Sequence, residues 1–337
     1  MKHISICIIS LWVGILAVSC GKSGPEAPEA PETSEGIPMS FGPAAVSRSA
    51  NLLDTDNINT SGNQLTVYDL YTTSGQSVLY MNATQVTCDG NGNWTYSPLK
   101  YWTETGTHAF TAYLSRLTLD GTNASYPTVT YNQTDNTLSI SPWKITPDNQ
   151  FDFLYAYHSR SMTAETDPHR QVEFELNHLL CAVQFNVVNL YDVTTNLNVS
   201  NFKISGLTNR QQAVLSLSDG AVSYVKDQSN VGTGEISVAK SVSVEYNRSY
   251  NVFSDYATVG TEGYLLMWPH DAGDIFNKLQ VSFYQGNSLR TLSLASADTN
   301  HWSAGQKYVY NIYIQDNRIS LEVKVVPWKV DDVIIEE

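Results

Sequence analysis

Apolar residues recur at every second position along almost the whole of this 337-residue chain. Strict alternation puts the apolar side chains on one face of an extended strand, whereas a helix needs them three or four positions apart. Turn sequences such as Asp120-Gly121 and Asp219-Gly220 separate the alternating runs. Short strands at this spacing predict an all-β protein of antiparallel sandwiches and not a parallel α/β sheet. The clearest runs have these apolar positions: Phe151, Phe153, Tyr155, Tyr157; Val172, Phe174, Leu176; Cys181, Val183, Phe185, Val187; Tyr308, Tyr310, Ile312, Ile314; Ile319, Leu321, Val323, Val325.

The length and a change of phase predict two domains. Once a leader and a short tether are set aside, about 300 residues remain, more than one hydrophobic core usually serves. The apolar positions are even-numbered from Val172 to Leu176 and odd-numbered from Cys181 onward, and a strand changes parity only at a bulge or a break. We therefore predict two tandem β-sandwich domains, over residues 37–178 and 179–337. A single bulged strand across this point is the alternative.

The first 36 residues predict export and tethering. Residues 4–18 form an uncharged apolar run behind Lys2, which suits a secretory signal and is short for a permanent membrane span. We predict a signal peptide over residues 1–19 and lipid attachment at Cys20, because the small residues before this cysteine resemble a bacterial lipobox. An ordinary secretory signal with a chance cysteine is the alternative. Residues 20–36 repeat Pro-Glu-Ala and predict an extended tether without core residues.

Composition argues against one class of partner and one kind of stabilisation. The formal net charge is −14, with only 19 lysines and arginines, which argues against nucleic acid because phosphate binding needs clustered cations. Apart from Cys7 in the signal and Cys20, the only cysteines are Cys88 and Cys181. We expect two independent half-buried cysteines in preference to one disulfide, so stability should rest on apolar burial.

Sequence patterns for enzymatic chemistry are absent. The chain has no HExxH, no GxSxG, no glycine-rich phosphate loop and no paired CxxC, so we predict no catalytic residue, no metal and no cofactor. His158 and His169 flank an arginine-containing loop that we interpret as solvated, with a metal site as the alternative. Asp152, Glu173 and Glu175 fall opposite the apolar stripes of their strands. We expect these three carboxylates to face solvent.

An aromatic cluster lies at residues 94–102. It holds Trp94, Tyr96, Tyr101 and Trp102 within nine positions. Packing between the sheets of a sandwich is the interpretation that we favour. The alternative is a carbohydrate-binding surface lipoprotein in which Trp94, Tyr101 or Trp102 stacks on a sugar ring, and a secreted glycosidase comes third.

The two ends of the folded body carry extended apolar segments. Ile37, Met39 and Phe41 alternate with polar or small residues, and Arg48, a basic residue in a stretch without others, follows them. An exposed arginine at the end of a strand is an efficient site for a trypsin-like protease. At the other end, residues 330–335 (VDDVII) follow an interruption at Pro327-Trp328. A removable first strand and a spare last strand would allow assembly by strand exchange, while two permanent edge strands are the simpler alternative.

Several short motifs resemble the fimbrillin family, the subunits of type V pili. They are FLYAYHSRS within residues 151–161, VEFELNHLLCAVQF at 172–185, FKISGL at 202–207, LLMWP at 265–269 and WSAGQKYVYNIYIQDNRISLEVKVVPW at 302–328. The resemblance implies two transthyretin-like β-sandwich domains and a lipidated precursor on the outer membrane. It also implies cleavage by a trypsin-like protease after an arginine, loss of the first strand and assembly with other fimbrial subunits by strand exchange.

Carried onto this chain, the resemblance implies a lipid on Cys20 and a cut between Arg48 and Ser49. The released strand would hold Ile37, Met39 and Phe41, and the donor strand would present Val330, Val333, Ile334 and Ile335. Shaft, anchor and tip subunits share this fold, so the place of the subunit in the fibre stays open, and an anchor need not lose its first strand.

Overall fold

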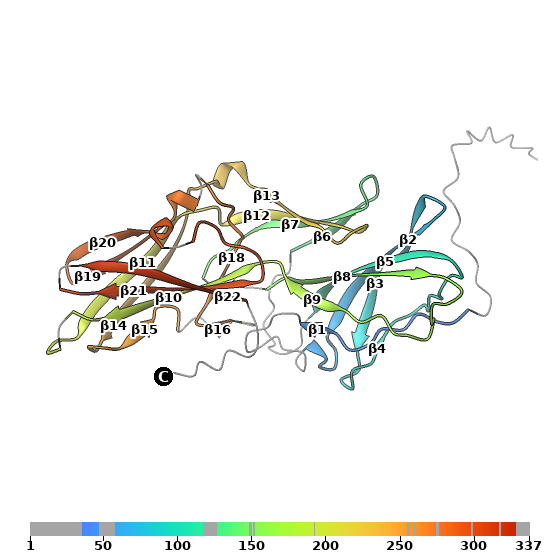
Figure 1. Ribbon diagram of the computed structural model, residues 1–337, viewed down its shortest axis with the longest axis horizontal. Coiled ribbons are helices and arrows are strands. Elements are labelled where there is room, and N and C mark those ends of the chain that lie inside the picture. Colours follow the sequence, from blue (N-terminus) through green and yellow to red (C-terminus); the bar gives the residue numbers. More distant parts are fainter. Residues whose placement is uncertain are drawn as a thin grey trace, which may run out of the picture.

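The computed structural model describes residues 36–46, 58–116, 127–147, 150, 152–191, 193–254, 257–258, 261–273, 276–297, 299–316 and 318–327. The molecule is elongated, with the earlier strands at one end and the later strands at the other (Figure 1). Strands dominate, as the alternation predicted. Beside them the described residues form three short 3₁₀ helices: η1 (Gln228–Asn230), η2 (Phe276–Lys278) and η3 (Leu294–Ser296).

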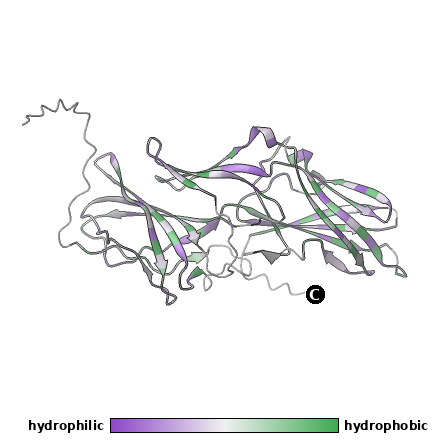
Figure 2. Ribbon diagram, turned by 180° about the vertical axis from the view of Figure 1, so that it is seen from behind, coloured by the Kyte–Doolittle hydropathy of each residue, from purple (hydrophilic) through white to green (hydrophobic). Residues whose placement is uncertain are grey.

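A seven-stranded sheet forms the N-terminal body, in the order β1-β9-β8-β5-β2-β3-β4. Its pairs are antiparallel except at one edge, where β1 runs parallel to β9. Successive residues along these strands alternate between hydrophobic and hydrophilic (Figure 2), because neighbouring side chains point to opposite faces. The strands are β1 (Ala45–Val46), β2 (Gln64–Thr73), β3 (Gln76–Cys88), β4 (Trp94–Thr95), β5 (Gly106–Arg116), β8 (Leu154–Met162) and β9 (Glu175–His178).

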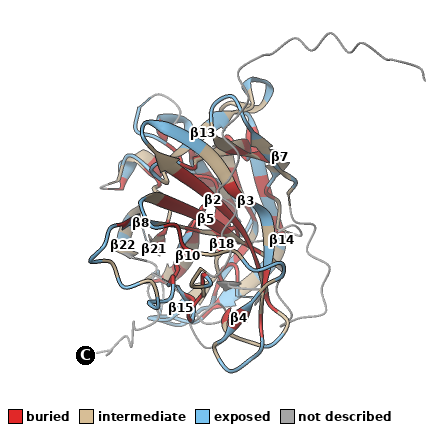
Figure 3. Cartoon of the chain, turned by 90° about the vertical axis from the view of Figure 1, so that its right-hand side faces the viewer, coloured by how far each residue is buried: buried red, intermediate tan, exposed pale blue. Residues whose placement is uncertain are grey.

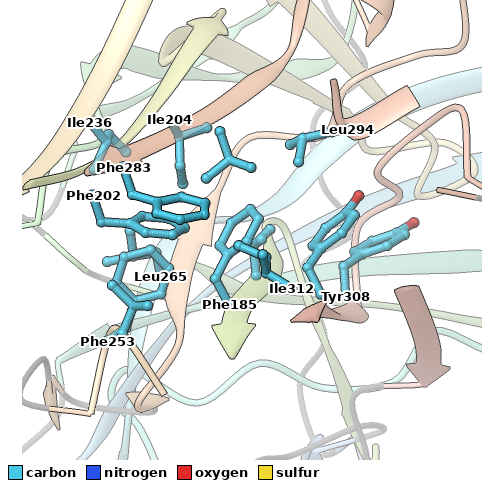
Figure 4. Close-up of a cluster of buried hydrophobic side chains, with 14 of the residues drawn as sticks. Phe185, Phe202, Ile204, Ile236, Phe253, Leu265, Phe283, Leu294, Tyr308 and Ile312 are labelled. Carbon is cyan, nitrogen blue, oxygen red and sulfur yellow. The ribbon is translucent and has the colours of Figure 1, made fainter. Parts of the chain in front are cut away.

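The C-terminal body is a sandwich of two sheets. One sheet has the order β15-β10-β21-β22, with β18 also paired to β10, and the other has the order β14-β11-β19-β20. Aromatic side chains fill the space between them (Figure 4): Phe185 stacks on Tyr310 at 4.9 Å, and Phe202 on Phe283 at 6.0 Å. The strands are β10 (Cys181–Asn189), β11 (Leu197–Leu207), β14 (Gly234–Val244), β15 (Ser249–Asn251), β18 (Leu265–Met267), β19 (Gln280–Gln285), β20 (Ser288–Ser293), β21 (Gln306–Ile314) and β22 (Ile319–Pro327).

A fourth sheet joins the two bodies. Its order is β13-β12-β7-β6, so strands from both sides of the predicted boundary at residues 178–179 pair with one another. Beneath it a separate core brings Trp143 and Trp268 to a ring separation of 4.2 Å. The domain boundary at residues 178–179 therefore stays a prediction. The two units on either side of it both contribute strands to this sheet. Its strands are β6 (Val129–Asn132), β7 (Thr137–Lys144), β12 (Arg210–Ser216) and β13 (Val222–Lys226), and a further hairpin pairs β16 (Ala257–Thr258) with β17 (Thr261–Glu262).

The change of phase after Leu176 is a break between two sheets. β9 ends at His178 and β10 begins at Cys181, in different sheets, and Leu179 and Leu180 between them are fully buried. The alternative of one bulged strand is therefore wrong.

The expectation of a solvent-facing Asp152 is also wrong. Asp152 is buried, and its Oδ2 lies 2.5 Å from Nδ1 of His178. The reason is that the chain here is covered on both faces, since Phe153 belongs to the core beneath the joining sheet and Leu154 to the core of the N-terminal body. Alternation alone assigned one of these faces to solvent. Glu173 and Glu175 are exposed as predicted.

The remaining burial follows the layers, with buried residues concentrated in the central strands and exposed residues in the outer strands and loops (Figure 3). Cys88 and Cys181 are free and lie in different hydrophobic cores, which confirms two independent cysteines, although both are fully buried and not half-buried. Over the described part of the chain, no helix is long and apolar enough to cross a membrane.

His270 gives the fold a predicted pH dependence. Its Nε2 accepts from the Thr208 backbone N–H at 2.9 Å, and its Nδ1 donates to the Trp268 carbonyl at 2.8 Å. Burial lowers the pKa of this imidazole from 6.5 to about 4. Because the folded pKa is depressed, the unfolded chain binds the extra proton first, so stability is present above pH 6.5 and is lost as the pH falls toward 4.

The expected loss from this residue is about 3 kcal/mol in the free energy of unfolding. Urea unfolding of the native chain and of His270→Gln, at pH 7 and at pH 4.5, measures it. The native chain should lose more stability between the two pH values than the variant, whose amide does not titrate. Equal losses would show that His270 takes up its proton without unfolding.

Candidate functional site

Residues 36–46, here called the N-terminal segment, lie extended between two parts of the N-terminal body. On one side they meet residues 94–102. The Met39 backbone N–H donates to the Lys100 carbonyl at 2.8 Å, and the Trp102 N–H donates to the Ile37 carbonyl at 3.0 Å. Antiparallel bridges join Pro38 to Tyr101 and Phe41 to Trp94. The segment thus extends the sheet edge that residues 94–102 form.

On its other side the N-terminal segment pairs with residues 172–176. The Val172 N–H donates to the Ser40 carbonyl at 2.8 Å, the Gly42 N–H to Val172 at 2.9 Å and the Ala45 N–H to Phe174 at 2.8 Å. The pairing is parallel at Phe41 and along β1. The segment therefore fills a slot with backbone partners on both sides, which we call the first-strand groove.

Apolar side chains hold the segment in this groove. Met39 and Phe41 are 2% and 1% exposed, Ala44 is buried as well and Ile37 packs against the same core from a partly buried position. The Phe41 ring stacks on Phe174 at 5.6 Å and meets Tyr96 and Phe110 edge-on at 5.4 and 6.0 Å. Pro38 on the opposite face is exposed. The alternation of Ile37, Met39 and Phe41 in the sequence thus corresponds to one inward face.

Asn59 holds the end of the N-terminal segment by hydrogen bonds, and no sequence pattern predicted this role. Its Nδ2 donates to the Ala44 carbonyl at 2.8 Å, and its Oδ1 accepts from the Ala44 N–H at 3.0 Å and from Trp94 Nε1 at 2.9 Å. One side chain thus satisfies both backbone groups of Ala44 and links them to the aromatic cluster. A single asparagine outside any periodic run carries no signal of such a role.

The aromatic cluster forms a wall of the groove and is not an exposed platform. Trp94 and Trp102 are 4% and 5% exposed, and the Tyr96 hydroxyl donates to the Met39 carbonyl at 3.1 Å. The Arg160 guanidinium lies over the Trp102 ring at 4.6 Å. Since neither indole offers a free face, the interpretation as core packing agrees with the structure. The sugar-stacking alternative finds no support at Trp94 or Trp102.

Three buried polar side chains, those of Asp69, His108 and Thr103, form a line of hydrogen bonds in the same core. Nδ1 of His108 is 2.7 Å from Oδ2 of Asp69, and its Nε2 is 3.0 Å from the Thr103 hydroxyl. Burial raises the pKa of Asp69, and the hydrogen bond from His108 opposes that rise. The order hydroxyl, imidazole, carboxylate is also that of hydrolytic triads. However, Thr103 is buried and its hydroxyl donates to the Thr105 carbonyl at 2.8 Å, so we assign the line a structural role.

The other predicted site residues lie outside the described part of the chain. These are Cys20, Arg48, Ser49, Val330, Val333, Ile334 and Ile335. Lipidation, cleavage and strand donation at these positions stay predictions. Within the residues that are described, no group of three histidines, cysteines or carboxylates could hold a metal ion.

Comparison with known proteins gives a family match and a set of similar folds. A model of the fimbrillin-like family matches residues 51–328. A fimbrial protein from Bacteroides vulgatus has a TM-score of 0.59 at 17% identity, covering 86% of this chain and 99% of that one. A candidate cell adhesion protein from Bacteroides uniformis has a TM-score of 0.53 at 15% identity, with coverages of 87% and 98%. These likenesses establish a shared fold. Comparison with curated proteins finds no match.

The packing of Phe41 predicts which substitution loosens the N-terminal segment. Phe41→Ala removes a ring held by three others, and a buried Phe→Ala change typically costs about 3–5 kcal/mol. We expect faster hydrogen exchange over residues 36–46 and earlier proteolysis there. Pro38→Ala, at an exposed position of the same segment, is the matched control and should leave both rates unchanged. Equal protection of the segment in both variants would contradict its anchoring through Phe41.

Proposed function

The chain belongs to the fimbrillin-like family, and from this premise we propose that it is a fimbrial subunit that assembles by strand exchange. Membership of the family makes it a structural, non-enzymatic protein of cell-surface fimbriae. The observation that carries the proposal is the N-terminal segment, whose backbone bonds to both walls of a groove and whose apolar face fills it. Such a segment is a complete strand that another strand of similar pattern can replace.

The first step of the proposal is removal of the segment. Arg48 follows the last described residue of the segment, Val46, by two positions, so a trypsin-like cut between Arg48 and Ser49 detaches everything before it. The segment is then held by non-covalent contacts alone. Met39 and Phe41 each contribute roughly 1.5–3 kcal/mol of apolar burial, so the empty groove is an unstable state that favours a new occupant.

The second step is insertion of a strand from a neighbouring subunit. Val330, Val333, Ile334 and Ile335 supply the apolar positions, and they follow closely after β22, which ends at Pro327. Backbone hydrogen bonds to both walls would supply affinity, and the pockets left by Met39 and Phe41 would set the register. The partners are accordingly other fimbrial subunits, identical or related.

The third part of the proposal is the export of the precursor and its attachment to the membrane. The signal peptide of residues 1–19 directs export, and a lipid on Cys20 holds the precursor at the outer membrane through the tether of residues 20–36. In a polymerising subunit the cut after Arg48 discards lipid, tether and first strand together. In an anchor subunit the lipid would remain.

Mass spectrometry of the N-terminus in purified surface filaments tests this proposal. Filaments of the native chain should contain protein that begins at Ser49, and Arg48→Ala should abolish both this terminus and the filaments. Ser49→Ala keeps the arginine and serves as the matched control that still assembles. In parallel, truncation after Trp328 should block assembly and leave the monomer folded.

Two results would contradict the proposal at separate points. Filaments that contain only acylated Cys20 as N-terminus would remove the cleavage step. Normal filaments from the chain truncated after Trp328 would remove the donor role of residues 330–335.

A further inference from the structure

β22 is a long and regular strand at the edge of its sheet. Among the described residues its only strand partner is β21, with which all nine residues from Ile319 to Pro327 align without a register shift. Natural edge strands are usually short, bulged or otherwise protected, because a straight edge offers its backbone groups to any other strand. Along residues 319–325 β22 is neither short nor bulged, and the charges that it exposes are Glu322 and Lys324, which are of opposite sign.

The other edges of the described sheets are protected in those ways. β1 and β4 have two residues each, β15 has three, β6 four and β13 five. β14 is long, but its pairing with β11 has two register shifts. β20 has six residues and exposes Arg290. β22 therefore differs from every other edge strand in combining length with regular pairing.

The core-facing side of β22 is incompletely covered. Leu321 and Val323 are partly buried and pack against the C-terminal core, while Val325 on the same face is 45% exposed. A further strand beside residues 319–325 of β22 would cover Val325 and add backbone pairs along this edge. On the opposite face Glu322 and Lys324 are both exposed, so the edge carries one negative and one positive charge two positions apart.

We propose that β22 is an interface between two copies of this chain, joined edge to edge as antiparallel strands. The charge pattern selects the register. With Val323 opposite Val323 of the second copy, Glu322 lies opposite Lys324 and Lys324 opposite Glu322, while Leu321 lies opposite Val325 on the core-facing side. The Val323 pair lies on the twofold axis and each of the other contacts occurs twice, as a twofold interface requires, and opposite charges across an antiparallel pair stabilise it.

This interface is independent of strand exchange. It uses the edge of the C-terminal sandwich and leaves the first-strand groove filled, so it requires no cleavage. Two copies would share one continuous sheet and lie side by side. Such an association differs from the end-to-end addition of subunits.

Sedimentation of the full chain in detergent tests the interface. The chain carries Arg48→Ala throughout, so that the first strand stays in place and strand exchange does not contribute. We expect a concentration-dependent dimer. Glu322→Lys and Lys324→Glu each convert two attractive pairs into two repulsive ones, so each should weaken dimerisation roughly tenfold. The double variant restores opposite charges in every pair and should dimerise like the parent.

A second variant tests the core-facing side. Val325→Lys places a charge opposite Leu321 of the second copy and should give a monomer, while the exposure of Val325 allows the subunit itself to fold. Arg290→Glu, on the edge strand β20, is the matched charge control and should dimerise normally.

Three outcomes would overturn the proposal. They are a chain that stays monomeric at about 100 µM, well above the range of specific interfaces, single charge reversals that dimerise like the parent, and a double variant no better than the singles. A fourth result would overturn it as well: dimerisation that appears only after truncation at Pro327 would make residues 328–337 the occupant of this edge in place of a second copy.

Discussion

The fit of the N-terminal segment into its groove is the interaction on which the N-terminal body depends. Phe41 packs among Phe174, Tyr96 and Phe110, so one side chain from the start of the chain completes a core built from three distant segments. Backbone bonds to Lys100 on one side and to Val172 and Phe174 on the other hold it in place. A strand that is enclosed in this way contributes much of the stability of the body, and its covalent link to that body passes through a single stretch of chain that includes Arg48.

The rest of the architecture is tied together by contacts that do not involve the N-terminal segment. β7 and β12 pair across the two halves, and the core beneath them, with Trp143 against Trp268, ties the joining sheet to both. Two buried carboxylate–imidazole pairs, Asp69 with His108 and Asp152 with His178, add directional contacts within the N-terminal body and where β9 gives way to β10. Breaking one partner of such a pair leaves a buried polar group uncompensated, typically at about 3–5 kcal/mol. These contacts remain when the first strand is lost.

The alternation of apolar residues in the sequence predicted those features of the fold that depend on a single strand and on the face that it buries. It identified the all-β fold, the inward face of Met39 and Phe41, and the break after His178. It failed where a segment is covered on both faces, as at Asp152, because a period of two assigns every second residue to solvent. It could not predict the pairing of β7 with β12, which joins residues about seventy positions apart. Nor could it predict the hydrogen bonding of Asn59 to Ala44. Contacts of that kind depend on three-dimensional neighbours and not on local pattern.

A disulfide that holds the N-terminal segment in the first-strand groove tests most directly whether the segment must leave the groove before subunits assemble. Pro38 and Tyr101 face each other in an antiparallel bridge, a spacing that suits a disulfide between Pro38→Cys and Tyr101→Cys. The purified double variant is treated with a trypsin-like protease and examined by electron microscopy, oxidised and after reduction. We expect cleavage in both states but filaments only after reduction, when the segment is free to leave. Filaments from the oxidised protein, with the disulfide intact, would contradict it.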